Sequence, residues 1–142
     1  MTKMPISDIS EVQTNIEFYR DQVVFTNLGG RAIERPEGEL HSIQSIGALL
    51  EAFTQLPAFD PEENKEWYVG VYPCVKEDKD GIQRLSFYCV PTIGEKGLTN
   101  PPGTPISVTK VTDYIQAVNG AVTPTELSEI QNNVFDIGNH WP

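Results

Sequence analysis

The sequence predicts an α+β domain, in which a small, mainly antiparallel sheet is centred on a hairpin at residues 66–93. Three to four helices are expected to pack mostly on one face of that sheet. The hairpin segment holds the densest run of β-branched and aromatic residues in the chain. Apolar residues recur instead at helical spacing in the segments 8–20, 42–55 and 124–135. A chain of 142 residues can bury a core, so we expect one domain over residues 1–142.

The turn of the predicted hairpin is the segment Asp78-Lys79-Asp80-Gly81. It suits a type I turn followed by a glycine in the left-handed region, the usual three-residue hairpin loop with a bulge. This loop pairs Asp78 with Ile82, and it then sets Tyr72 against Tyr88 across the two strands. The register is preferred because it separates the side chains into two contrasting faces.

One face of the predicted hairpin is largely apolar and is expected to be the core face, with the helices packed on its Trp67–Val71–Phe87 surface. It gathers Trp67, Val69, Val71, Pro73, Val75, Leu85, Phe87, Cys89 and Pro91. The opposite face is amphipathic and contains three tyrosines, two cations and a serine. It gathers Tyr68, Gly70, Tyr72, Cys74, Lys76, Arg84, Ser86, Tyr88 and Val90.

The remaining elements follow from apolar spacing, capping residues and turn residues. In chain order we expect a helix at 8–20, short strands at 23–26 and 31–34, a helix at 42–55, an aperiodic loop at 94–105, a strand at 106–110, a short helix at 111–118 and a final helix at 124–135. Ser7 is the expected cap of the first helix, and Thr123 or Thr125 the expected cap of the last.

The charge balance of the chain is strongly acidic. Twenty acidic residues stand against ten basic ones, which gives a formal net charge of −10. Nucleic-acid backbones and anionic membrane surfaces both require a basic protein surface, so neither is an expected partner. Apolar runs also stay well below the roughly 18 residues that a membrane span needs. The charge fits a soluble protein or one that binds a basic partner.

The two cysteines, Cys74 and Cys89, are too few for a disulfide framework. The predicted register places them on opposite faces of the hairpin, where they could not bridge. We therefore expect reduced, buried, structural thiols and a cytoplasmic protein. The first residues contain no apolar stretch of the kind found in secretory signals, which agrees with that compartment.

Candidate metal and catalytic groups are sparse. Glu37, Glu39 and His41 alternate along one segment as zinc or iron ligands can, but no second ligand cluster supports them. A cysteine nucleophile would need a nearby histidine base, and the local sequence brings neither His41 nor His140 to a cysteine. We expect no cofactor, no metal and no catalytic residue. The absence of a catalytic motif favours a protein that is not an enzyme.

The amphipathic hairpin face is the strongest functional signal, because Tyr68, Tyr72, Arg84 and Tyr88 would gather on it. Tyrosine and arginine dominate binding hot spots. We therefore predict a non-enzymatic protein-interaction domain, either an adaptor, an inhibitor or immunity-type partner, or an assembly subunit, that binds a protein partner or another copy of itself. Two alternatives remain open. The face could be covered by a helix, or the chain could be a small enzyme or small-molecule-binding protein with a pocket between the hairpin and the helices.

Overall fold

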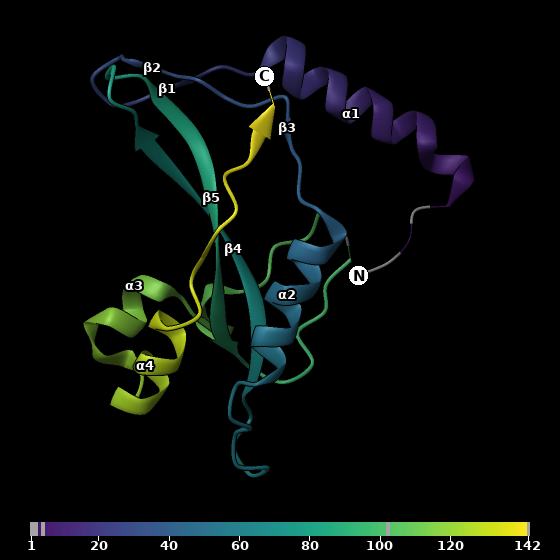
Figure 1. Cartoon of the computed structure of the whole chain (residues 1–142). Coiled ribbons are helices and arrows are strands. Elements are labelled where there is room, and N and C mark those ends of the chain that lie inside the picture. Colours follow the sequence, from purple (N-terminus) through teal and green to yellow (C-terminus); the bar gives the residue numbers. More distant parts are fainter. Residues whose placement is uncertain (1–2, 4, 102, 142) are drawn as a thin grey trace. The chain divides into compact units, whose positions relative to one another are not determined.

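The computed structural model describes residues 3, 5–101 and 103–141, and the chain divides into two compact units. Unit 1 lies within Met1–Glu39, Val75–Leu85 and His140–Pro142, and unit 2 comprises Leu40–Cys74 and Ser86–Asn139. The strands β4 (Glu66–Glu77) and β5 (Gln83–Gly94) form a long hairpin (Figure 1). Each of them has residues in both units. The expectation of one domain over residues 1–142 stays a prediction.

The predicted α+β class is confirmed. Unit 2 contains α2 (Ile43–Thr54), α3 (Tyr114–Gln116) and α4 (Pro124–Gln131), with the 3₁₀ turn η2 (Val108–Lys110) and the π-helical turn η3 (Ala117–Ala121). Its sheet has the order β4-β5-β6, and β7 also pairs with β5; β6 is Val111–Thr112 and β7 is Phe135–Asp136. Both short strands run antiparallel to β5, with Ile93 opposite Thr112 and Cys89 opposite Phe135.

Local capping chemistry explains where the helices of unit 2 begin. Ser42 caps α2 by accepting the backbone N–H of Ser45. Thr123 and Glu126 form a reciprocal capping box at the start of α4, with Pro124 in the first turn. The prediction of α2 over 42–55 is therefore confirmed to within a residue at each end.

Three predicted elements near the carboxyl end are wrong in extent. The short helix expected at 111–118 begins only at Tyr114, because Val111–Thr112 pair with β5 as β6. The strand expected at 106–110 is a turn, because the Ser107 hydroxyl accepts the N–H of Thr109 and closes it; the strand forms only at 111–112. The final helix ends at Gln131 and not at residue 135. Phe135 leaves the helix because it pairs with Cys89 as an added strand and packs its ring 6.0 Å from that of Phe53 on α2.

The core of unit 2 lies between β5 and the helical segment that follows it. Its buried residues are Val90, Ile93, Ala117 and Ile130. Partly buried residues pack around these four: Phe59, Trp67, Tyr72, Tyr88, Tyr114, Val122 and Leu127. Aromatic rings thus supply much of the shell, and large rings contribute strongly to burial energetics.

Unit 1 contains η1 (Ile6–Asp8), α1 (Ile9–Gln22), β1 (Phe25–Thr26), β2 (Ala32–Ile33), β3 (Gly38–Glu39), β8 (His140–Trp141) and the tip of the hairpin. The two short strands predicted before residue 35 are confirmed, and β1 and β2 pair with each other in antiparallel orientation. Arg35 organises this unit: its Nε donates to the Val23 carbonyl at 2.6 Å, and its guanidinium lies 4.8 Å from the Tyr19 ring centroid.

The predicted hairpin turn is confirmed. Gly81 has φ +80°, and its N–H donates to the Asp78 carbonyl at 3.0 Å. The Asp78 N–H donates in turn to the Ile82 carbonyl at 3.0 Å, which is the expected closing pair. The Asp78 carboxylate also accepts the N–H groups of Asp80 and Ile82.

The predicted sidedness of β4 is wrong. Val69, Val71 and Val75, assigned to the core face, are 43%, 57% and 49% exposed, so no helix covers the expected surface at Val71. Ser86 and Val90, assigned to the opposite face, are buried, and Tyr72 and Tyr88 pack on the core of unit 2. A tyrosine buries more apolar area than a valine, and its hydroxyl can be satisfied inside the fold, so the tyrosine side of β4 is the covered one. On β5 both sides are buried, because Cys89 and Pro91 of the predicted core face are buried as well.

Candidate functional site

The four residues predicted to bind a partner are divided between the two units. Tyr68, Tyr72 and Tyr88 belong to unit 2, and Arg84 belongs to unit 1. Tyr88 packs against the buried cluster of unit 2, so its ring is part of the core shell. The structure therefore does not bring the four residues together within one unit.

The hydroxyls of Tyr68 and Tyr72 bind the chain itself. Tyr72 Oη lies 3.0 Å from Thr92 Oγ1 and accepts the backbone N–H of Tyr114 at 3.2 Å. Tyr68 Oη donates to the Glu95 carbonyl at 2.7 Å and accepts the N–H of Leu98 at 3.0 Å. These contacts tie the start of α3 and the turn after β5 to the sheet, which is a structural role.

Arg84 takes part in an ion-pair group at the hairpin tip. Its Nε lies 3.1 Å from Glu34 Oε2, and its Nη1 also binds the Asp78 carboxylate. The Ile82 N–H and the Arg84 guanidinium both hold the pKa of Asp78 below its usual range, with the backbone hydrogen bond as the larger cause. The hydrogen bond to Asp78 likewise raises the pKa of Arg84. This group fixes the turn geometry of the hairpin.

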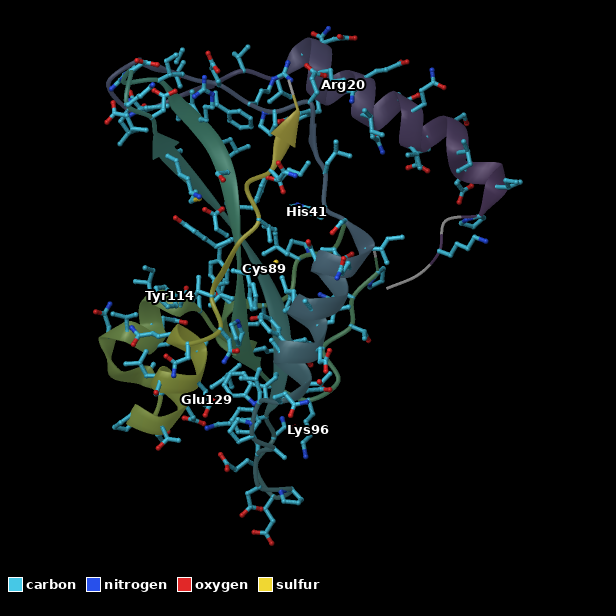
Figure 2. The ribbon with its side chains drawn as sticks, viewed as in Figure 1. Arg20, His41, Cys89, Lys96, Tyr114 and Glu129 are labelled. Atoms are coloured by element: carbon cyan, nitrogen blue, oxygen red, sulfur yellow. The ribbon has the colours of Figure 1, made fainter. Side chains whose placement is uncertain are left out.

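A pocket that the sequence did not predict lies in unit 2, where the segment before β4 meets α4. We call it the Phe59–Trp67 pocket, and its volume is about 280 Å³. It is lined by Pro57, Ala58, Phe59, Asp60, Glu63, Lys65, Trp67, Thr123, Thr125, Glu126 and Glu129. Figure 2 shows Glu129 on α4 and Tyr114 at the start of α3.

The aromatic wall of this pocket is rigidly held. The rings of Phe59 and Trp67 lie 4.9 Å apart between centroids, at an interplanar angle of 32°. The indole N–H of Trp67 donates to the Pro57 carbonyl at 2.8 Å, which fixes the orientation of the ring. Both rings also pack against the buried cluster of unit 2. The wall is thus an extension of the core and not a loose surface feature.

The pocket is also acidic, because Asp60, Glu63, Glu126 and Glu129 all line it. Glu126 is held by the backbone at the start of α4. Its Oε1 accepts the N–H of Thr123 at 2.9 Å, and its side chain is only 16% exposed. The Asp60 carboxylate accepts the N–H of Glu62 at 3.0 Å and so shapes the turn before β4.

The chain places one cation of its own in the pocket. Lys65 Nζ lies 5.9 Å from the Phe59 ring centroid, 3.2 Å from Glu63 Oε2 and 4.0 Å from Glu126 Oε2. An aromatic face flanked by carboxylates attracts an ammonium through both the ring quadrupole and the ionic charges. The pocket thus contains both kinds of group, an aromatic face and carboxylates, that contact the ammonium of Lys65.

A second pocket of unit 2, of about 350 Å³, lies between the first turns of α2 and the segment around β7. His41, Ser42, Ser45 and Asp136 line it together with apolar residues. The Ser42 hydroxyl donates to Ser45 Oγ at 2.7 Å and accepts the Ser45 N–H at 3.0 Å. Those bonds make Ser42 a helix cap, which is a structural use of the hydroxyl.

Among the side chains that the structure describes, at residues 3, 5–101 and 103–139, no group of three or more His, Cys, Asp or Glu could hold a metal ion. Cys74 is half-buried and Cys89 is buried, and no disulfide joins them. The described helices include none that is both long and apolar enough to cross a membrane.

Sequence reasoning missed the Phe59–Trp67 pocket because its two sides lie far apart in the chain. Residues 57–67 supply one wall and residues 123–129 the other. Two signals were present: the capping box that orients Glu126, and the acidic turn between Phe59 and Trp67. Neither says that the two segments meet.

No protein-family model matches the chain, and comparisons with curated proteins and with solved structures found no match.

Proposed function

We propose that the chain is a non-enzymatic protein-interaction domain, and that it binds a basic segment of a partner protein through the Phe59–Trp67 pocket. The observation that carries this proposal is the position of Lys65, whose ammonium lies among Phe59, Glu63 and Glu126. A pocket that holds one cation intramolecularly has the chemistry to hold another from a partner.

The charge of the protein supports a basic partner. The pocket presents four carboxylates and one ammonium, so a negative charge remains after Lys65 is counted. The whole chain carries a formal charge of −10, which steers basic molecules toward it and repels nucleic acid. An adaptor, an inhibitor or immunity-type protein, or an assembly subunit would each use such a surface.

The partner-binding role of Tyr68, Tyr72, Arg84 and Tyr88 stays a prediction. Tyr68 and Tyr72 form hydrogen bonds within the chain, and Arg84 forms ion pairs within it, so these contacts stabilise the fold. We therefore base the interaction on the Phe59–Trp67 pocket. We also propose a cytoplasmic location, which is supported by a cysteine count of two, too few for the disulfide framework of a typical small secreted domain.

The second candidate function is small-molecule binding or catalysis in the pocket lined by His41, Ser42, Ser45 and Asp136. Its support is that an imidazole, two hydroxyls and a carboxylate share one pocket of about 350 Å³. The capping bonds of Ser42 count against a nucleophilic role for that hydroxyl. The non-enzymatic proposal therefore has the better support.

A fluorescence titration tests the proposed function. A Trp141→Phe background leaves Trp67 as the single tryptophan, so its emission reports on the pocket. The probe is a twelve-residue peptide of alternating lysine and glycine, and the control probe replaces each lysine with glutamate. We expect saturable binding of the lysine peptide alone, and weaker binding as salt is raised.

Charge-matched variants make this test specific. Glu126→Gln/Glu129→Gln should abolish the lysine-peptide signal, while glutamine preserves the capping box at α4. Glu11→Gln/Glu51→Gln removes the same charge from exposed positions outside the pocket and should bind as the parent does. Equal loss in both variants, or no saturable binding by the parent, would overturn the proposal.

A further inference from the structure

The side chain of Lys65 is held in the Phe59–Trp67 pocket by contacts that are individually weak. Its distance of 5.9 Å to the Phe59 centroid is near the outer limit of a cation–π contact. Its nearest carboxylate, that of Glu63, is 44% exposed, and Lys65 itself is 43% exposed. Pairs this accessible are screened by solvent and contribute little to stability.

The wall behind Lys65 is, by contrast, firmly built. Trp67 is fixed by its hydrogen bond to the Pro57 carbonyl, and Glu126 is fixed by the capping box at the start of α4. Removal of Lys65 from the pocket would therefore leave the aromatic surface and the carboxylate in place. A preorganised receptor with a loosely held occupant favours exchange of that occupant for a better one.

This inference rests on the proposed function and names its ligand: we propose that the pocket accepts a lysine side chain of the partner protein at the place held by Lys65. Lys65 is then an internal competitor, which must move before the partner's lysine enters. The partner's affinity is reduced by the fraction of molecules in which Lys65 occupies the pocket.

The dimensions of the pocket agree with a single side chain. With Lys65 among its lining residues, the pocket has a free volume of about 280 Å³, just below the roughly 300–1,000 Å³ of pockets that enclose drug-sized ligands. The rings of Phe59 and Trp67 are only 4.9 Å apart, so nothing inserts between them, and a ligand meets one ring face. A compact ammonium on a flexible stem fits this geometry better than a planar guanidinium that needs a stacking slot and a bidentate carboxylate.

Replacement of Lys65 tests the competition directly. Lys65→Gln keeps the polarity and much of the length of the side chain but removes the ammonium. We expect Lys65→Gln to bind the alternating lysine–glycine peptide about two- to five-fold more tightly than the parent, which corresponds to the loss of one exposed ion pair. Lys110→Gln makes the same change in net charge outside the pocket and should leave the affinity unchanged.

The two proposals fail in different ways in this experiment. If the parent binds the lysine peptide but Lys65→Gln binds it equally or more weakly, Lys65 is no competitor and the inference is overturned while the proposed function stands. If neither protein binds the peptide, the proposed function itself is wrong.

Three further probes test the identity of the ligand group. A matched arginine–glycine peptide should bind more weakly than the lysine peptide. Its affinity should also increase less when Lys65 is replaced by glutamine. Free butylammonium and choline should compete with the lysine peptide only at far higher concentration, because they lack the rest of the partner segment. Preference for the arginine peptide, or displacement by either free amine at the peptide's own concentration, would overturn the assignment of a partner lysine.

Discussion

Tyr72 Oη lies 3.0 Å from Thr92 Oγ1, and the two hydroxyls form the middle of a four-member hydrogen-bond chain. The Tyr114 N–H donates to Tyr72, and Thr92 donates to the Val90 carbonyl at 3.0 Å. The chain joins the two strands of the hairpin to the first residue of α3. The tyrosine thereby becomes a core residue with a satisfied polar end.

The first prediction concerns this chain. Tyr72→Phe should destabilise the protein by about 1–3 kcal/mol, because the N–H of Tyr114 and the hydroxyl of Thr92 lose a partly buried partner. Thr92→Val should have an effect of similar size. Urea unfolding of both single variants and of the double variant measures the coupling, and the double variant should cost less than the two single costs added. Strict additivity would show that the hydroxyls act independently.

The second prediction concerns Gly70, which lies beside the same pair. A Cβ at this position would approach Thr92 Oγ1 to 2.3 Å and the Tyr72 ring to 2.5 Å. Gly70→Ala should therefore destabilise by about 1–3 kcal/mol through overpacking. Gly47→Ala is the matched control, because a Cβ there meets nothing within 4 Å in the middle of α2. It should stabilise by about 0.5–1 kcal/mol, so the two melting temperatures should move in opposite directions.

The third prediction concerns the hairpin turn. Gly81 has φ +80°, so Gly81→Val should destabilise by about 1–2 kcal/mol through left-handed strain. Gly81→Asn should cost clearly less, because asparagine tolerates this backbone region. Differential scanning calorimetry of the two variants separates strain from simple loss of a glycine. Equal melting temperatures for the valine and asparagine variants would contradict the turn geometry.

The fourth prediction compares two isoleucines. Ile130 on α4 is 2% exposed within the core of unit 2, whereas Ile43 at the start of α2 is 93% exposed. Ile130→Ala should cost about 2–5 kcal/mol, and Ile43→Ala should change stability by less than about 0.5 kcal/mol. Chemical denaturation followed by circular dichroism measures both. A small effect at Ile130 would show that the core of unit 2 lies elsewhere.

The fifth prediction concerns acid stability and depends on Asp78. The folded pKa of this carboxyl lies below its ordinary value of 3.8, chiefly because the Ile82 N–H binds the ionised form. The stability that it contributes is therefore complete above pH 3.8 and is lost as the pH falls through the lower, folded pKa.

Asp78→Asn should lower the melting temperature at pH 7 and should flatten its fall below pH 4. Asp21→Asn removes a carboxylate from α1, outside the turn, and should preserve the acid dependence of the parent. If the melting temperature of Asp78→Asn fell with acid as fully as that of the parent, the Asp78 carboxylate would not be a source of the acid dependence.

Several features of the fold follow from local sequence. The Asp78–Gly81 turn was predictable because only glycine enters the left-handed region without cost, and because the aspartate can bind the following N–H groups. The bounds of α2 were predictable from Ser42 and an unbroken apolar stripe. In each case the decisive interactions lie within a few residues of one another.

Which side of the hairpin strands is covered could not be predicted from local sequence. Alternation groups Tyr68, Tyr72 and Tyr88 on one side of the strands and Val69 and Val71 on the other, but it does not say which side a helix will cover. The tyrosine side was covered because its hydroxyls found partners in Thr92, Tyr114 and Glu95. Those partners become neighbours only when the chain folds.

By itself, the sequence determined the α+β class, the hairpin turn, the capped starts of α2 and α4 and the acidic charge, because these depend on residue type and on short-range geometry. The predicted Ser7 cap of the first helix is wrong, since Asp8 occupies the N-cap position of α1 and its side chain caps no N–H. Tertiary structure alone decided which side of β4 is covered and where the candidate site lies. The Phe59–Trp67 pocket joins segments about sixty residues apart, around an aromatic wall continuous with the core and the Glu126 carboxylate that the capping box of α4 orients. Such a pocket forms only when non-local packing brings its two sides together, and no local pattern in the chain encodes that contact.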